Sequence, residues 1–187
     1  MKHPQRALAV ILALVLIAGS ASAAGTSVTI KGGYFSPSDE IFRDVYGGGP
    51  SFGLEIAVPL AGILQAWVGA ELFSKKGLTT ESEEATKVRI VPLYAGLRCQ
   101  FAGKSVRPYI GAAAGYFLIR EENPLGTASD GGIGFLGQTG FLIGLGPSLA
   151  LDVHAGYRAC TVTTGGDDPV EAKLGGLSAG LGLSYRF

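Results

Sequence analysis

The sequence predicts an all-β fold: an eight-stranded antiparallel up-and-down β-barrel that crosses a membrane, preceded by a cleavable signal peptide. The first observation is the composition. The 187 residues are 47% hydrophobic and include 30 glycines but only 15 basic and 15 acidic side chains. Beyond the N-terminus, no apolar run reaches the roughly 18 residues that predict a membrane helix. Apolar residues instead alternate with small or polar ones, which is typical of a strand between two different environments.

The first 23 residues have the organisation of a secretory signal peptide. Lys2 and Arg6 precede an apolar stretch over residues 7–18, and the segment ends in Ala21-Ser22-Ala23. An N-terminal membrane helix would need about 20 apolar residues and is less favoured. We therefore expect cleavage after Ala23 and a single barrel domain over residues 24–187. The mature chain would carry two more acidic than basic side chains, which argues against nucleic acid as a partner.

Eight segments show the alternation, with one apolar parity and one parity of glycine, small and polar residues. They span residues 27–35, 50–58, 64–74, 87–101, 106–121, 133–144, 148–163 and 176–187. In chain order, the apolar parity consists of Val28, Ile30 and Tyr34; Phe52, Leu54, Ile56 and Val58; Leu64, Ala66, Val68, Ala70 and Leu72; Val91, Leu93, Ala95, Leu97 and Phe101; Ile110, Ala112, Ala114, Tyr116 and Leu118; Phe135, Phe141 and Ile143; Leu149, Leu151, Val153, Ala155 and Tyr157; and Leu177, Ala179, Leu181, Leu183, Tyr185 and Phe187.

The connections between these segments alternate between short and long. Short turns are expected at residues 59–62, 102–105 and 146–147, and longer loops at 36–49, 75–86, 122–132 and 165–170. This alternation is typical of an up-and-down barrel with one trimmed rim, which in outer-membrane barrels faces the periplasm. Both termini would then be periplasmic. Within the first long loop, Ser36, Pro37 and Asp39 precede apolar residues at helical spacing, which predicts a short helix ending at Gly47.

The parity with the small residues does not resemble a water-exposed face. It holds isolated charges of both signs among glycines, whereas a solvated strand face is denser in Lys, Glu and Thr. An eight-stranded barrel is filled by its own side chains, so this parity suits a narrow polar lumen, and the apolar parity would face lipid. Trp67 and Phe73 argue against this assignment, because their large aromatic side chains fall on the lumen parity. A β-bulge, or an aromatic side chain packed inside the lumen, would explain their position. A soluble periplasmic barrel is the competing fold.

The C-terminal residues carry a resemblance to a known family. Leu181 and Leu183 alternate before Tyr185 and the final Phe187, which is similar to the C-terminal signature of bacterial outer-membrane barrels. With the predicted signal peptide and eight strands, the chain resembles the small OmpA/OmpX-like outer-membrane β-barrel family. The resemblance implies a location in the outer membrane of a Gram-negative bacterium. It also implies that the barrel-assembly machinery reads this terminal signature, after delivery by periplasmic chaperones.

Nine ionisable residues share the lumen parity and are expected to form a hydrogen-bonded ion-pair network that fills the barrel. They are Lys31, Glu55, Glu71, Arg98, Arg107, Asp152, His154, Arg158 and Arg186. A structural role is the first interpretation of this network. The alternative is a gated ion path, in which breaking one ion pair opens a narrow conductance.

Other chemistry finds little support in the sequence. His154 and Asp152 share a strand face with Ser148, but same-face neighbours on a strand lie roughly 7 Å apart, so Ser148 lies too far from His154 for a nucleophile and its base. Cys99 and Cys160 fall on opposite parities at opposite strand ends, which predicts two free thiols. One histidine after cleavage and no Cys/His cluster leave no metal site, and no cofactor is expected.

The sequence therefore predicts a monomeric outer-membrane barrel with a closed lumen, surrounded by membrane lipid and lipopolysaccharide. Its expected role is non-enzymatic, in envelope integrity or surface interaction. A small gated channel and an outer-membrane lipid-modifying enzyme are the second and third hypotheses.

Overall fold

The computed structural model describes residues 25–78, 85–123, 126–164 and 170–187. The predicted signal peptide lies outside these residues and stays a prediction. In chain order the elements are β1 (Ser27–Pro37), α2 (Glu40–Tyr46), β2 (Gly49–Ala61), β3 (Leu64–Leu78), β4 (Ala85–Gln100), β5 (Val106–Asn123), β6 (Gly126–Gly144), β7 (Leu149–Thr164), β8 (Val170–Lys173) and β9 (Gly176–Arg186).

The strands form one closed antiparallel barrel. Strands β1 to β7 each pair with the next along the chain, and β9 pairs with both β7 and β1, where Ile30 lies opposite Leu183. The short β8 pairs with the end of β7, and the Leu174 N–H donates to the Cys160 carbonyl at 2.8 Å. Strands β8 and β9 are therefore two parts of one barrel strand, interrupted at residues 174 and 175. The described barrel has eight such strands, which confirms the predicted fold class.

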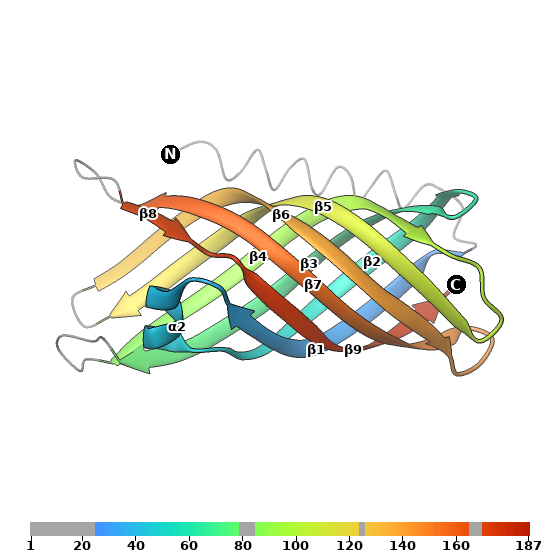
Figure 1. Cartoon of the computed structure of the whole chain (residues 1–187), viewed down its shortest axis with the longest axis horizontal. Helices are drawn as coiled ribbons and strands as arrows, with labels where there is room; N and C mark the ends of the chain where they lie inside the picture. Colours follow the sequence, from blue (N-terminus) through green and yellow to red (C-terminus); the bar gives the residue numbers. More distant parts are fainter. Residues whose placement is uncertain (1–24, 79–84, 124–125, 165–169) are drawn as a thin grey trace.

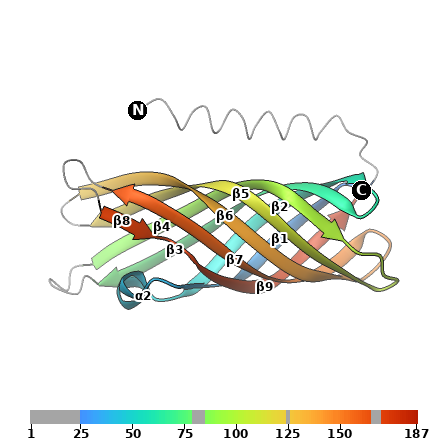
Figure 2. The same ribbon diagram turned by 45° about the horizontal axis from the view of Figure 1, so that its top comes forward.

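The barrel is elongated, with steeply tilted strands and α2 at one end (Figures 1 and 2). The C-terminus lies at the opposite end, where the Gly25 N–H donates to the Phe187 carbonyl at 2.8 Å. We call these two ends the α2 end and the terminal end. Strands β1 to β7 and β9 each pair with a neighbour on both sides, and only the short β8 has a single neighbour, β7. The ring of the wall is therefore closed among the described residues, as lipid requires of a spanning sheet.

Strand pairing extends into two of the predicted long loops, so the boundaries predicted for these loops were wrong. Strands β3 and β4 stay paired to Leu78 opposite Ala85, and β5 and β6 to Asn123 opposite Gly126. Strands of 18 and 19 residues exceed the 9–11 needed to span a bilayer. Polar residues hide these extensions in the sequence, because a hairpin that reaches into water keeps its backbone pairing but no longer needs an apolar face.

The short helix predicted after β1 is present as α2. Its N-cap is Asp39, whose carboxylate Oδ1 accepts a hydrogen bond from the Phe42 N–H at 2.9 Å. It ends at Gly47, whose φ of 64° favours glycine. Ser36 and Pro37 belong to β1 rather than to the helix cap. Among the described residues, no helix is long and apolar enough to cross a membrane.

The apolar parity faces outward, as predicted. Large outward side chains are half-exposed or more along the wall, including Ile30, Leu54, Ile110, Phe135, Leu181 and Leu183. The C-terminal signature residues Tyr185 and Phe187 also point outward, with ring centroids 5.0 Å apart. A water-soluble barrel buries its bulky apolar residues inside, so this exterior matches a lipid-facing wall.

Candidate functional site: the barrel interior

The interior near the α2 end is a cluster of buried apolar side chains, which we call the apolar plug. Its members come from α2, from five barrel strands and from the connection between β8 and β9: Phe35, Tyr46, Phe73, Val88, Ile90, Phe117, Cys160, Val162 and Leu174. Phe35 and Phe73 meet edge to face with ring centroids 5.2 Å apart. Phe42 of α2 packs against the cluster, 6.5 Å from Phe73. The sequence predicts a lumen that is polar throughout, and this prediction is wrong at the α2 end. A small hydrophobic core closes the lumen there.

Tyr46 fixes α2 to the barrel wall. Its hydroxyl donates to Glu121 Oε1 at 2.7 Å and lies 3.1 Å from Thr86 Oγ1. Burial raises the pKa of Tyr46 to about 12, because the ionised phenolate would lose its hydration and face the Glu121 carboxylate. The helix is thus attached by a hydrogen bond that requires a neutral phenol.

The two aromatic residues that opposed the lumen assignment are packed inside the barrel. Phe73 belongs to the apolar plug, and Trp67 packs against Tyr94 with ring centroids 5.0 Å apart. Tyr94 in turn lies over Gly69, where an added Cβ would come within 2.4 Å of the ring. Glycine at position 69 therefore makes room for a lumen aromatic on the neighbouring strand.

The middle of the interior holds an ion-pair network centred on Glu55, a carboxylate that is 1% exposed. Lys31 Nζ lies 2.8 Å from Glu55 Oε2, and the Arg98 guanidinium donates to Glu55 Oε1. Gln138 Nε2 also donates to Glu55 at 3.3 Å. One buried acid is thus shared by two buried cations, and these contacts restrain three strands at once.

Asp152 forms the second acidic centre of this network. Tyr109 donates its hydroxyl to Asp152 Oδ1 at 2.9 Å, and Lys31 Nζ lies 3.5 Å from Oδ2. His154 Nδ1 is 3.3 Å from the same oxygen. The Arg98 guanidinium lies over the Tyr109 ring at 5.1 Å, so aromatic and ionic contacts combine here.

A separate buried ion pair lies between the network and the apolar plug. Arg158 Nη2 donates to Glu71 Oε1, and the Arg158 guanidinium lies 4.1 Å from the centroid of the Phe35 ring. Arg158 therefore connects this ion pair to the apolar plug.

Arg107 and Arg186 lie apart from the other predicted network residues. Both line a hollow of about 150 Å³ at the terminal end. Arg186 is exposed and donates to the Pro147 carbonyl at 3.4 Å, and in the described structure neither arginine forms an ion pair. The open end of a barrel is hydrated, so cations there need no carboxylate partner, and the parity pattern alone does not distinguish this depth.

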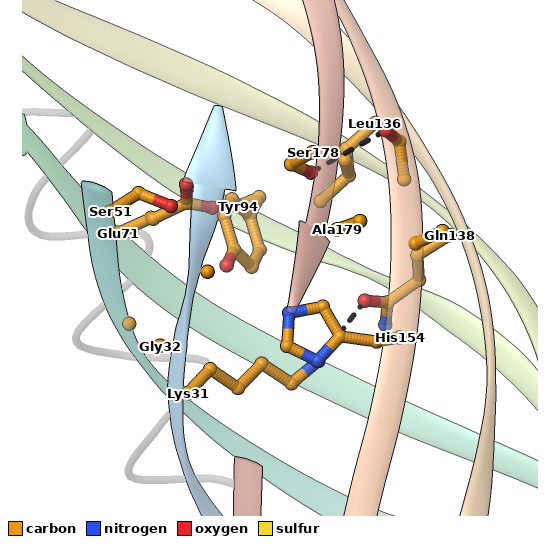
Figure 3. A pocket seen from close by; sticks show the side chains of 14 residues that line it. Lys31, Gly32, Ser51, Glu71, Tyr94, Leu136, Gln138, His154, Ser178 and Ala179 are labelled. Atoms are coloured by element: carbon orange, nitrogen blue, oxygen red, sulfur yellow. Dashed lines mark hydrogen bonds between the residues drawn. The ribbon is translucent and has the colours of Figure 1, made fainter. Parts of the chain in front are cut away.

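The space that remains inside the barrel is small. A cavity of about 20 Å³ lies inside the barrel, lined from β1, β2, β3, β4, β6, β7 and β9 by Lys31, Glu71, Tyr94, Gln138, His154 and Ser178 among others (Figure 3). That volume suits about one water molecule. The charged and amide side chains of Lys31, Glu71 and Gln138 make its lining polar.

The arrangement offers little for catalysis. His154 lines the internal cavity, whereas Ser148 lines the hollow at the terminal end, so the structure keeps them apart. Cys99 and Cys160 are free thiols, as predicted. Within the residues that the structure describes, no three His, Cys, Asp or Glu side chains gather as metal ligands.

Sequence reasoning placed the charged members of the network on the inner face but assigned no role to Tyr109, Gln65 or Gln138. Gln65 accepts a hydrogen bond from Arg98 Nε at 2.7 Å, and Gln138 accepts one from Lys31 at 3.3 Å. All three residues share the inner parity with the charges, and this parity is the signal that could have identified them.

Comparison with known proteins supports the fold and goes no further. No protein-family model matches the chain, and no curated protein matches its sequence. Among solved structures, Neisserial surface protein A matches with a TM-score of 0.60 at 20% identity, covering 88% of this chain and 98% of that one. OprG from Pseudomonas aeruginosa matches with a TM-score of 0.62 at 15% identity, covering 88% and 97%. Outer membrane protein W from E. coli gives 0.51 at 17% identity, covering 88% and 98%.

All three matched structures are small barrels, and the matches span almost their entire length. The resemblance that the C-terminal residues indicated is therefore confirmed at the level of architecture. The chain has the fold of the small eight-stranded outer-membrane β-barrels.

Proposed function

We propose that the chain is an integral protein of the outer membrane of a Gram-negative bacterium, with its lumen closed and a non-enzymatic role in envelope integrity or surface interaction. The observation that carries the proposal is the inversion of the barrel. Large apolar side chains cover the outside while ion pairs and polar groups fill the middle of the inside. Water on the outside would oppose this arrangement, and lipid would stabilise it.

The orientation follows from the same proposal. The α2 end carries the long hairpins and would face outward, while the terminal end, with its short turns, would face the periplasm. Leu181, Leu183, Tyr185 and Phe187 would then be the outward-facing signature that the assembly machinery reads. The barrel acts as a monomer in this proposal.

Fractionation of cells that express the full chain tests the location. The barrel should sediment with outer membranes and migrate faster on gels before heating than after it, since a folded barrel resists detergent unfolding. Recovery in the soluble periplasmic fraction would overturn the proposal in favour of a soluble barrel.

Conductance separates the closed barrel from the gated path. A path would have to cross both the Glu55 network and the apolar plug, whose aromatic side chains fill the α2 end of the lumen. In planar bilayers we expect no channel events from the wild-type protein or from Glu71→Gln. Steady unitary currents that the Glu71 substitution alters would favour the channel instead.

The absence of an enzymatic role is tested through His154, the ring that lies beside Asp152. Whole cells that express wild-type protein or His154→Gln should have the same lipid A composition by mass spectrometry as cells without the protein. A lipid A change that disappears in His154→Gln would support the enzyme hypothesis and overturn ours.

A further inference from the structure

Four cations gather on the outward face of the barrel wall near the α2 end. We call Lys76, Lys87, Arg89 and Arg120 the cation row; all four lie on the outward parity of β3, β4 and β5. Arg89 lies directly opposite Arg120, and Lys87 directly opposite Lys76. Like charges directly opposite each other destabilise a sheet. An anion bound between two such cations would reduce their repulsion.

Among the described residues, two acids lie near the cation row and are fewer than its four cations. Glu122 Oε1 lies 2.9 Å from Arg120 Nε, but both side chains are about half exposed. Asp130 lies near Arg89 and Arg120 on the wall of the same hollow. Glu122 also lies directly opposite Lys87, so within the part of the chain that the structure describes, two acids stand near the four cations of the row.

An open hollow connects the two arginines to the apolar wall. Its volume is about 540 Å³, and Val91, Tyr116 and Leu118 line it together with Arg89 and Arg120. The Tyr116 ring lies over Gly131, where an added Cβ would come within 2.5 Å of the hydroxyl oxygen. The lining of the hollow thus combines two guanidinium groups and one carboxylate with apolar side chains.

We propose that this hollow binds a phosphorylated glycolipid of the outer leaflet, with its headgroup phosphate between Arg89 and Arg120 and an acyl chain along Val91, Tyr116 and Leu118. The assignment rests on the proposed location and orientation in the outer membrane. Arginine is suited to phosphate because its planar group donates two parallel hydrogen bonds to neighbouring oxygens. A phosphate between the two arginines would also relieve their mutual repulsion.

The test measures lipid binding to the folded full-length barrel in nanodiscs of neutral phosphatidylcholine. Diphosphoryl lipid A and the same lipid without phosphates are titrated, and bound lipid is counted by native mass spectrometry. We expect the wild type to prefer the phosphorylated lipid at least tenfold, since one charge-assisted contact alone supplies about that factor. Arg89→Gln/Arg120→Gln should lose the preference.

A matched control removes the same amount of charge elsewhere. Arg43 is exposed on α2 and Lys104 is exposed in the turn before β5, and neither lines the hollow. Arg43→Gln/Lys104→Gln should therefore bind lipid A like the wild type. Equal losses in both double variants would reduce the effect to net charge and overturn the site.

The outcomes also separate this site from the proposed function. A barrel that inserts and shows heat-dependent migration but binds both lipids equally overturns the glycolipid site alone. A soluble sulfated polysaccharide can also be added at the same concentration of negative charge as lipid A. If it displaces lipid A, the glycolipid site is overturned and the cation row is a site for soluble polyanions. Failure to insert into lipid at all overturns the membrane location on which the site depends.

Discussion

The two regions of the barrel interior are filled and stabilised by different kinds of interaction. At the α2 end, Phe35, Phe73 and Phe117 form a dry apolar plug, whereas in the middle Glu55 and Asp152 hold buried cations through ion pairs and hydrogen bonds. Burial stabilises the plug in proportion to its apolar area. The network is stable only while its charges stay paired, because an unpaired buried charge is costly. The inner face of the barrel therefore combines a region stabilised by apolar packing with one stabilised by charge pairing.

Removing the central carboxylate charge should have the largest effect. Glu55→Gln leaves Lys31 and Arg98 buried without their shared acid, and we expect a loss of about 4 kcal/mol in unfolding free energy. Urea unfolding in lipid vesicles, followed by the fluorescence of Trp67, measures it. Glu40→Gln is the control, because its ion pair with Arg43 is exposed and its loss should cost under about 1 kcal/mol. Equal losses would mean that the network does not hold the barrel together.

Truncation in the apolar plug should come next. Phe73→Ala removes a fully buried ring that touches Phe35, and we expect a loss of about 3 kcal/mol in the same unfolding experiment. Leu72→Ala is the matched control, since the neighbouring side chain points outward and is 43% exposed. If Leu72→Ala proved as costly as Phe73→Ala, the plug would not be a packed core.

The attachment of α2 should respond more weakly. Tyr46→Phe removes the hydroxyl that donates to Glu121, at a cost of about 1 kcal/mol, and amide exchange within α2 should become faster. Because the pKa of Tyr46 is raised above 10 to about 12, its contribution is complete below pH 10 and is lost as pH rises through 12. The difference in tyrosinate absorbance between wild type and Tyr46→Phe should therefore have its midpoint near pH 12. A midpoint near pH 10 would show that the phenol is not buried.

How far the sequence predicts the interior depends on the region. Isolated charges among glycines marked Lys31, Glu55 and Asp152 as inner residues, because a charge cannot face lipid without a large cost. Phe73 and Trp67 gave no such signal, since an aromatic ring suits lipid as well as a packed lumen. Alternation predicts whether a side chain faces into or out of the barrel, but not its position along the barrel axis. For this reason the sequence pattern groups Arg107 and Arg186 with a network from which they lie apart.

The strand count and the face of each strand followed from alternation, but the strand ends did not. The described residues of the predicted loop 122–132 are paired strand, as in Glu122 opposite Thr127. Outside an apolar band both faces of a hairpin meet water, so the pattern that identifies a strand disappears while its backbone pairing persists. The break at residues 174 and 175 also left no signal in the sequence pattern, because it depends on tertiary contacts. Leu174 packs in the apolar plug, and the Ser38 N–H donates to the Gly175 carbonyl at 3.0 Å.

The most direct test of the central claim, that the outward face meets lipid, is the unfolding free energy of two arginine variants in bilayers. Leu181 and Leu145 are similarly exposed, at 56% and 58%, but Leu181 lies midway along β9 and Leu145 lies just past the end of β6. In a membrane, Leu181→Arg should cost about 2–4 kcal/mol and Leu145→Arg about 0–1 kcal/mol, because the penalty depends on depth. Equal costs for the two variants would contradict a lipid-facing wall.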